Sequence, residues 1–274
     1  MRSVAGRKET QMNLRRVGAL VLRYTYVYQR SLLRLLEIFF WPAIDLLVWG
    51  FLTLYLQQEG RVLPAGIAFL VGAVIFWDII FRSQQGITLS FLEDIWSHNL
   101  LNLFSAPVRV TEFVAATCLV GILKTLVVGA YLAVLAFCLY RFNLLAIGPA
   151  LLPLFANLLL MGWSLGIATT GLLLRWGQAA EALAWAIPFA IQPFAAVFYP
   201  VSALPFWLRP VAWSIPATHA FEGMRLALRG RSAWGELAYA TLLNLVYLAL
   251  AGAWFGVLFT AARRKGLLAK IGTQ

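Results

Sequence analysis

Four ionisable residues lie inside long apolar stretches of the sequence, and they are the first candidates for chemistry: Asp45, Asp78, Lys124 and Glu181. Each would cost roughly 2.5–3.5 kcal/mol at the centre of a bilayer, so each is expected to face protein, another charge or water. Asp45 is the deepest acid. Two interpretations are open for it, a structural ion pair with Lys124 or a role in substrate passage.

No side-chain set typical of an enzyme accompanies these charges. A phosphate-binding loop needs glycines six and one residues before its Lys-Thr pair, but Lys124-Thr125 has Cys118 and Leu123 at those places. We therefore expect no ATP hydrolysis by this chain. The sequence also lacks a Ser/His/Asp set, paired carboxylates and metal-spaced histidines, so no metal site is expected and a membrane-embedded enzyme is a third-ranked hypothesis.

Composition indicates that lipid is the solvent for most of the chain. Apolar residues make up 62% of it and charged residues 12%, and the mean hydropathy is +0.81. Stretches of about 20 apolar residues are long enough to cross a bilayer as helices. We predict an all-α membrane protein with six transmembrane helices, at Ile38–Leu56, Leu63–Phe81, Phe113–Tyr140, Pro149–Leu174, Ala179–Ala203 and Leu237–Thr260.

Basic residues flank these predicted spans at both ends of the sequence. An even number of spans places both termini on one side, and the positive-inside rule makes that side the cytosol. Most of the net charge of +11 then lies beside anionic lipid and requires no nucleic acid. The expected domains are a basic tail with an interfacial helix (1–37), one transmembrane domain (38–262) and a basic cytosolic tail (263–274).

The segment before the first predicted span has the pattern of an amphipathic helix. One face carries Leu14, Val17, Val21, Tyr24 and Tyr28, and another carries Arg16, Arg23, Arg30 and Arg34. We predict a helix that lies along the cytosolic headgroups with its arginines on phosphates. The alternative is a frayed basic leader that only sets topology.

A polar but patterned segment separates the second and third predicted spans. It predicts a short cytosolic helix, at about 92–104, with Glu93 and Asp94 in its first turns, where the helix dipole favours anions. Such a helix is suited to docking on another protein. The candidate docking residues are Glu93, Asp94, Trp96, His98, Phe104, Pro107 and Arg109.

The segment 204–231 faces outward on this topology, yet it is strongly apolar. Its prolines exclude one continuous helix, so we predict two short helices that dip into the outer leaflet as a re-entrant pair. The alternative is a tryptophan-rich loop that rests on the interface. Candidate gate residues are Trp207, Trp213, Glu222 and Arg225, and the last two are spaced to form an ion pair.

Aromatic and small residues within the spans give two further hypotheses. Candidate substrate-pathway residues are Asp45, Trp49, Lys124, Trp185 and Phe189, although aromatic residues in spans more often pack or form an interfacial belt. The spacings Gly162-x-x-x-Gly166 and Gly252-x-x-x-Gly256 allow close helix contact. We interpret them first as packing sites, with a dimer seam as the alternative.

Four segments give the chain a family resemblance: Leu92-Glu93-Asp94-Ile95-Trp96, 102–109, 198–205 and 215–225. Together with the order of the predicted helices, they resemble the permease of an ABC-2 type exporter, over nearly the whole chain. The family's Ser-Pro-hydrophobic-Arg turn is here Ser-Ala-Pro-Val-Arg. Its Asn-Pro-Leu-Thr is here Ile-Pro-Ala-Thr.

The resemblance implies a half-transporter in a bacterial inner membrane. Two copies would form the pathway, and two separate cytosolic ABC ATPases would bind ATP and Mg²⁺ and receive the coupling helix at about 92–104. The implied activity is export of an amphiphilic cargo, a lipid-linked glycan or a hydrophobic drug-like molecule, by alternating access. The runner-up is an ion-coupled secondary transporter, although no inverted repeat or mid-membrane cluster of acids is visible.

Overall fold

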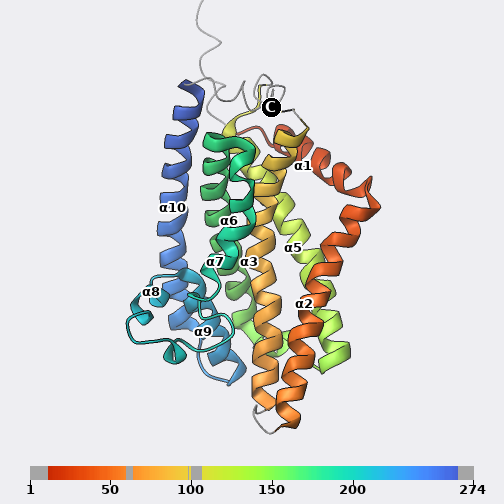
Figure 1. The fold of residues 1–274 in the computed structure, drawn as a ribbon, viewed down its shortest axis with the longest axis vertical. Coiled ribbons are helices and arrows are strands. Elements are labelled where there is room, and N and C mark those ends of the chain that lie inside the picture. The colour runs from red at the N-terminus through yellow and green to blue at the C-terminus, as the bar shows by residue number, and fades with distance from the viewer. Residues whose placement is uncertain (1–11, 60–63, 98, 100–106, 265–274) are drawn as a thin grey trace, which may run out of the picture.

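The computed structural model describes residues 12–59, 64–97, 99 and 107–264, and the regular structure of this part of the chain is helical. The long helices are α2 (Leu32–Gln58), α3 (Pro64–Trp96), α5 (Val110–Tyr140), α6 (Leu151–Trp176) and α10 (Trp234–Arg264). They form the bundle shown in Figure 1. The shorter elements are α1 (Leu14–Gln29), η1 (Leu144–Ala150), η2 (Gly177–Ala180), α7 (Glu181–Ile191), η3 (Val201–Ala203), α8 (Arg209–Trp213) and α9 (Pro216–Leu228).

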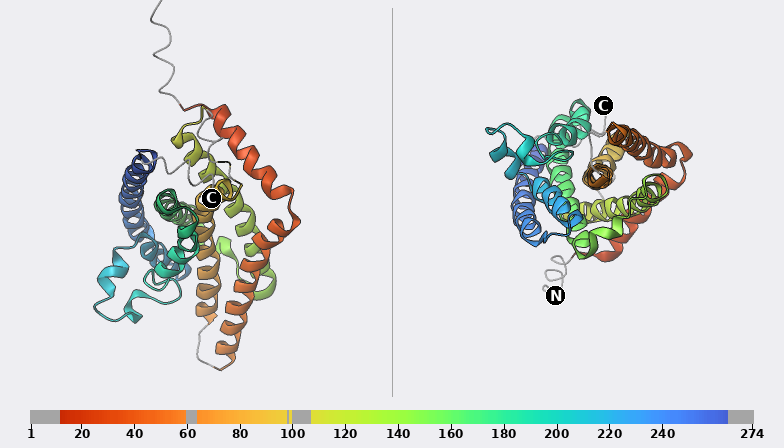
Figure 2. Two further views of the ribbon diagram at one scale, coloured as in Figure 1. Left: turned by 45° about the horizontal axis from the view of Figure 1, so that its top comes forward. Right: turned by 90° about the horizontal axis from the view of Figure 1, so that it is seen from below.

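Within the described residues, four segments are long and apolar enough to cross a membrane: α2, α5, the η1–α6 segment Leu144–Trp176, which has a kink at Gly148, and α10. The bundle has two distinct ends (Figures 1 and 2). Helix α1 and the C-terminal end of α10, with Arg263 and Arg264, lie at one end, here called the basic end. Helices α8 and α9 lie toward the other, here called the loop end.

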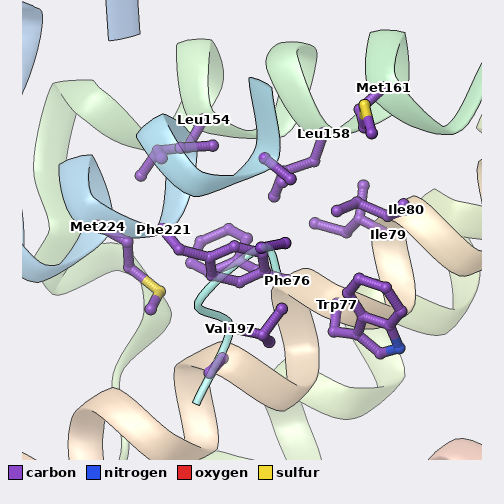
Figure 3. Packing of buried hydrophobic residues seen from close by; sticks show 14 of the residues in the cluster. Phe76, Trp77, Ile79, Ile80, Leu154, Leu158, Met161, Val197, Phe221 and Met224 are labelled. Carbon is purple, nitrogen blue, oxygen red and sulfur yellow. The ribbon is translucent and has the colours of Figure 1, made fainter. Parts of the chain in front are cut away.

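Helix α3 is the centre of the bundle. It contacts α2, α5, α6, α7 and α9, and its Phe76, Trp77 and Ile80 pack against Leu158 of α6 and Phe221 of α9 in the largest apolar cluster (Figure 3). The helix is 33 residues long, so at 1.5 Å per residue it extends over about 50 Å. One rigid element therefore connects the two ends of the molecule.

Glycines allow α3 to approach its neighbours closely. A Cβ atom on Gly162 of α6 would lie 1.7 Å from Oγ of Ser83, and one on Gly86 of α3 would lie 2.4 Å from Cα of Gly121 in α5. Gly166 also faces α3, with Ile87 as a neighbour. The first small-residue spacing is thus used for packing within the chain, as predicted, whereas a Cβ on Gly252 would meet no atom within 4 Å.

The predicted fifth span is wrong as a continuous helix. Helix α7 has only 11 residues and ends at Ile191, and turns and bends follow up to Pro200. Pro193 lacks the backbone N–H that another helical turn would need. The irregular segment enters the core instead, where Ala195, Ala196 and Val197 are completely buried.

Two boundaries at the basic end also differ from the prediction. The amphipathic segment does not continue to Arg34, because α1 ends at Gln29 and Ser31 begins α2 as its N-cap, accepting the backbone N–H of Arg34. Glu93 and Asp94 are not in the first turns of a new helix. They lie at the C-terminal end of α3, which ends only at Trp96.

Candidate functional site

Asp94 is the centre of a buried polar junction at the basic end. Its side chain is 0% exposed and accepts hydrogen bonds from the guanidinium of Arg23 and the hydroxyl of Tyr24, both on α1. The side-chain amide of Asn99 donates to the same carboxylate at 3.2 Å. Asp94 therefore joins α1 to α3 and is not available as a docking contact in this conformation.

The position of Asp94 explains why it needs these donors. The C-terminal end of a helix carries partial negative charge, which disfavours an acidic side chain. Arg23 and Tyr24 offset that cost from the neighbouring helix. Burial, together with the charge of Asp94, raises the pKa of Tyr24, so the phenol keeps the proton that it donates.

Two further acids extend the contact between the basic segment and the bundle. Glu93 pairs with Arg34 of α2 at 3.3 Å. Glu112, in the first turn of α5, accepts the backbone N–H groups of Arg109 and Asn13, each at 2.9 Å, and lies 3.7 Å from Arg16. The backbone hydrogen bonds from Arg109 and Asn13 lower the pKa of Glu112.

Apolar packing supports the same contact. Val17, Leu20 and Tyr24 of α1 are buried against a cluster that includes Phe91 and Phe113. Leu14, predicted on the apolar face, is 73% exposed. Three of the four arginines predicted to meet lipid phosphates, Arg16, Arg23 and Arg34, pair with acids of the chain, and only Arg30 is exposed without an ion pair among the described residues.

The other predicted docking residues are not gathered into one surface. Trp96 is exposed, and its indole N–H donates to Glu181 at 3.2 Å, which joins the ends of α3 and α7. Arg109 is the N-cap of α5, and Pro107 is exposed. His98 and Phe104 lie outside the described residues.

The predicted pathway residues divide into separate groups. Trp185 and Phe189 of α7 both contact the ring of Phe81 on α3, with centroids 6.4 and 5.5 Å apart. Asp45 of α2 lies within electrostatic range of Arg82, the residue that follows Phe81 on α3. These side chains therefore border one turn of α3, which also holds an ion pair of 2.9 Å between Asp78 and Arg82.

Two of the predicted pathway residues lie elsewhere. Trp49 stacks on Phe198 of the segment after α7, with centroids 4.4 Å apart. The ammonium of Lys124 lies 3.4 Å from the ring centroid of Tyr28 on α1. No ion pair joins Asp45 to Lys124, so that predicted pair is wrong.

At the loop end, Arg225 supplies hydrogen bonds to backbone carbonyls of the irregular segment that follows α7. It pairs with Glu222 at 3.0 Å, as the spacing predicted. Its guanidinium also donates to the carbonyls of Ala196, Val197 and Tyr199. Because a backbone without helical hydrogen bonds is tolerated inside a membrane only where it finds other partners, Arg225 is what permits α7 to stop early.

The pair of short helices is present as α8 and α9, each with proline in its first turn. Trp207 is 63% exposed and Trp213 is 39% exposed. His219, which no sequence pattern indicated, bridges the two helices to α10, because its ring nitrogens lie 2.7 Å from the carboxylate of Glu236 and 3.0 Å from the carbonyl of Trp213. A histidine and a glutamate 17 residues apart gave no periodic signal.

These features define a class. Apolar helices long enough to span a bilayer, a central 33-residue helix and a helix α1 held by buried charges make the chain a multi-pass membrane protein.

The family follows from comparison with known proteins. The family model of the ABC-2 type transporter matches residues 19–228, and the chain therefore belongs to that family of transport permeases. A search of curated proteins found no match.

Proposed function

We propose that the chain is the membrane subunit of an ABC exporter that moves an amphiphilic cargo, a lipid-linked glycan or a hydrophobic drug-like molecule, out of the bacterial cytosol. In this proposal six segments span the inner membrane, with α7 and the irregular segment after it as the fifth. The basic end faces the cytosol. Two copies of the chain form the pathway, and two separate ABC ATPases supply ATP hydrolysis with Mg²⁺.

The observation that carries the proposal is the junction at Asp94. Helix α3 ends there, the segment expected to meet the ATPase (about 92–104) includes it, and α1 is attached through Arg23 and Tyr24. A displacement of the predicted docking segment by an ATPase would therefore pull on α1 and α3 together. That connection is a direct route from ATP hydrolysis to the transmembrane helices.

The turn of α3 at Asp78–Arg82 supports a pathway between α3, α2 and α7. Asp45, Trp185 and Phe189 surround it and are all exposed in the single chain. Aromatic rings next to an ion pair suit a cargo with both apolar and polar parts. Alternating access would expose this surface first to the basic end and then to the loop end.

Reconstitution tests the partner and its coupling. The chain is co-expressed with a candidate ABC ATPase partner and purified, and ATP hydrolysis is measured with and without the chain in vesicles. The proposal expects a complex of two chains with two ATPases and hydrolysis that depends on the junction, so that Asp94→Asn weakens stimulation while Arg30→Gln does not. A stable one-to-one complex that still transports would contradict it.

Cysteine labelling tests the orientation. Cys118 and Cys138 are first replaced by serine, since Cys138 is exposed. A membrane-impermeant thiol reagent added to intact cells should react readily with Arg231→Cys, slowly with Trp213→Cys, and with Arg15→Cys only after permeabilisation. Reaction of Arg231→Cys from the cytosolic side alone would reverse the topology.

A further inference from the structure

A pocket of about 180 Å³ lies between α1, α2 and α5, on a side of the molecule that the proposed pathway does not use. Its apolar walls come from α2 and α5: Leu35, Ile38, Phe39, Val120, Leu123 and Val127. Tyr28 and Lys124 also line it. Gln29, Leu123 and Val127 are exposed, so the pocket opens at the surface of the bundle.

Lys124 carries a charge that the described part of the chain does not pair. The neighbouring cations have their own carboxylates, since Arg34 pairs with Glu93 and Arg82 with Asp78. Glu93 lies within electrostatic range of Lys124, but its ion pair is with Arg34. The ammonium of Lys124 instead contacts the face of the Tyr28 ring.

The depth of this ammonium follows from its partner. Tyr28 is on α1, the helix that lies across the basic end of the bundle (Figure 1), and a lysine side chain in a membrane extends its charge toward the interface. The pocket therefore combines a cation beside α1 with an apolar slot next to it. A ligand that matches both features has an anionic head and a hydrocarbon chain.

We propose that this pocket binds one anionic phospholipid of the surrounding membrane, with its phosphate against Lys124 and part of one acyl chain between α2 and α5. The lipid would neutralise the unpaired cation and fill the space below α1. The site would then hold α1, α2 and α5 together from the lipid side, while the Asp94 junction holds α1 to α3 from the protein side.

Lipid retention measured by native mass spectrometry tests this assignment. The full-length protein is delipidated in mild detergent and titrated with dioleoyl phosphatidylglycerol or, as the zwitterionic comparison, dioleoyl phosphatidylcholine. The wild-type protein should retain one phosphatidylglycerol molecule in preference to phosphatidylcholine. Lys124→Gln should lower that retention about fivefold, the factor expected when one interfacial lysine contributes its usual attraction for anionic lipid, and leave phosphatidylcholine unchanged.

Arg175→Gln is the matched control. Arg175 is an exposed cation at the end of α6 that lies over the ring of Trp176, but it borders no part of this pocket, so its loss should not change retention. Equal retention of phosphatidylglycerol by wild type and Lys124→Gln would overturn the proposal.

A second variant fills the slot and keeps the charge. Val127 is 55% exposed, so Val127→Trp can be accommodated without disturbing the core and should reduce retention of both lipids. Normal retention in this variant would show that the pocket is not the binding site. A polyprenyl phosphate that displaces phosphatidylglycerol far below equimolar amounts would assign the pocket to cargo, and would equally overturn a resident membrane lipid.

Discussion

The hydroxyl of Tyr24 donates a hydrogen bond to the carboxylate of Asp94, across 70 residues of sequence. The other carboxylate oxygen accepts a hydrogen bond from the guanidinium of Arg23, the residue next to Tyr24. Since Asp94 is completely buried, α1 cannot leave α3 without depriving a buried charge of its partners. The helix that the sequence suggested as a lipid-bound appendage is thus part of the folded bundle.

Removing either partner should destabilise the protein. We expect Asp94→Asn to cost about 3 kcal/mol and Tyr24→Phe about 1.5 kcal/mol, the range for hydrogen bonds that involve a charged group. Thermal unfolding in detergent measures both. Tyr26→Phe is the control, because Tyr26 is on the same helix and 56% exposed. If Tyr24→Phe and Tyr26→Phe unfold at the same temperature, the junction is not important for stability.

Acidification should release the start of α1. The folded-state pKa of Glu112 lies below its ordinary value of 4.5, so its stabilising contribution is complete above that pH and is lost as the pH falls through the lowered pKa. A nitroxide on Leu14→Cys should become more mobile in that range. Glu112→Gln should give high mobility already at neutral pH, whereas Glu37→Gln, at an exposed position on α2, should behave as wild type.

Arg225→Met should destabilise the loop end severely. The substitution leaves the carbonyls of Ala196, Val197 and Tyr199 without their donor and Glu222 without its cation, at a cost of about 3 kcal/mol or more. Arg225→Lys should recover only part of this, because an ammonium cannot reproduce the planar fork of a guanidinium. Arg229→Met, on the exposed residue that caps the C-terminal end of the same helix, should have little effect on the unfolding temperature.

Alanine substitutions should distinguish the two glycine spacings. Gly162→Ala places a Cβ 2.6 Å from the carbonyl oxygen of Ile80. Because this oxygen belongs to the backbone of α3, it cannot easily move away, and we expect about 1–3 kcal/mol of destabilisation. Gly252→Ala meets open space and should be neutral in the isolated chain. A Gly252→Leu variant that loses self-association at unchanged unfolding temperature would assign the second spacing to a dimer seam.

The sequence could predict features that depend on residues close together in the chain, such as the residues of a single helix. Long apolar runs predicted α2, α5, α6 and α10, because a spanning helix is specified by its own residues. The pairing of Glu222 with Arg225 was predictable for the same reason, since both lie on one helix.

Long-range contacts were beyond such reasoning. Glu93 and Asp94 looked like free acids at a helix start, and only the fold brings Arg23 and Arg34 to them. The predicted length of the fifth span was wrong, because hydropathy does not reveal that Arg225, from a later helix, can donate hydrogen bonds to the backbone carbonyls of a non-helical segment.

The ion pair between Asp78 and Arg82 has a consequence for how the protein is made. Its two charges lie four residues apart on α3, so they neutralise each other as soon as that helix forms, before any later helix has been synthesised. Lys124 has no such partner on α5 and meets Tyr28 only when α1 folds back. Insertion of α3 therefore needs no other helix to balance these two charges, whereas Lys124 of α5 gains its aromatic contact only when the N-terminal segment docks. Helices whose charged residues pair within the same helix can therefore insert without help, whereas a helix with an unpaired charge depends on contacts with other segments.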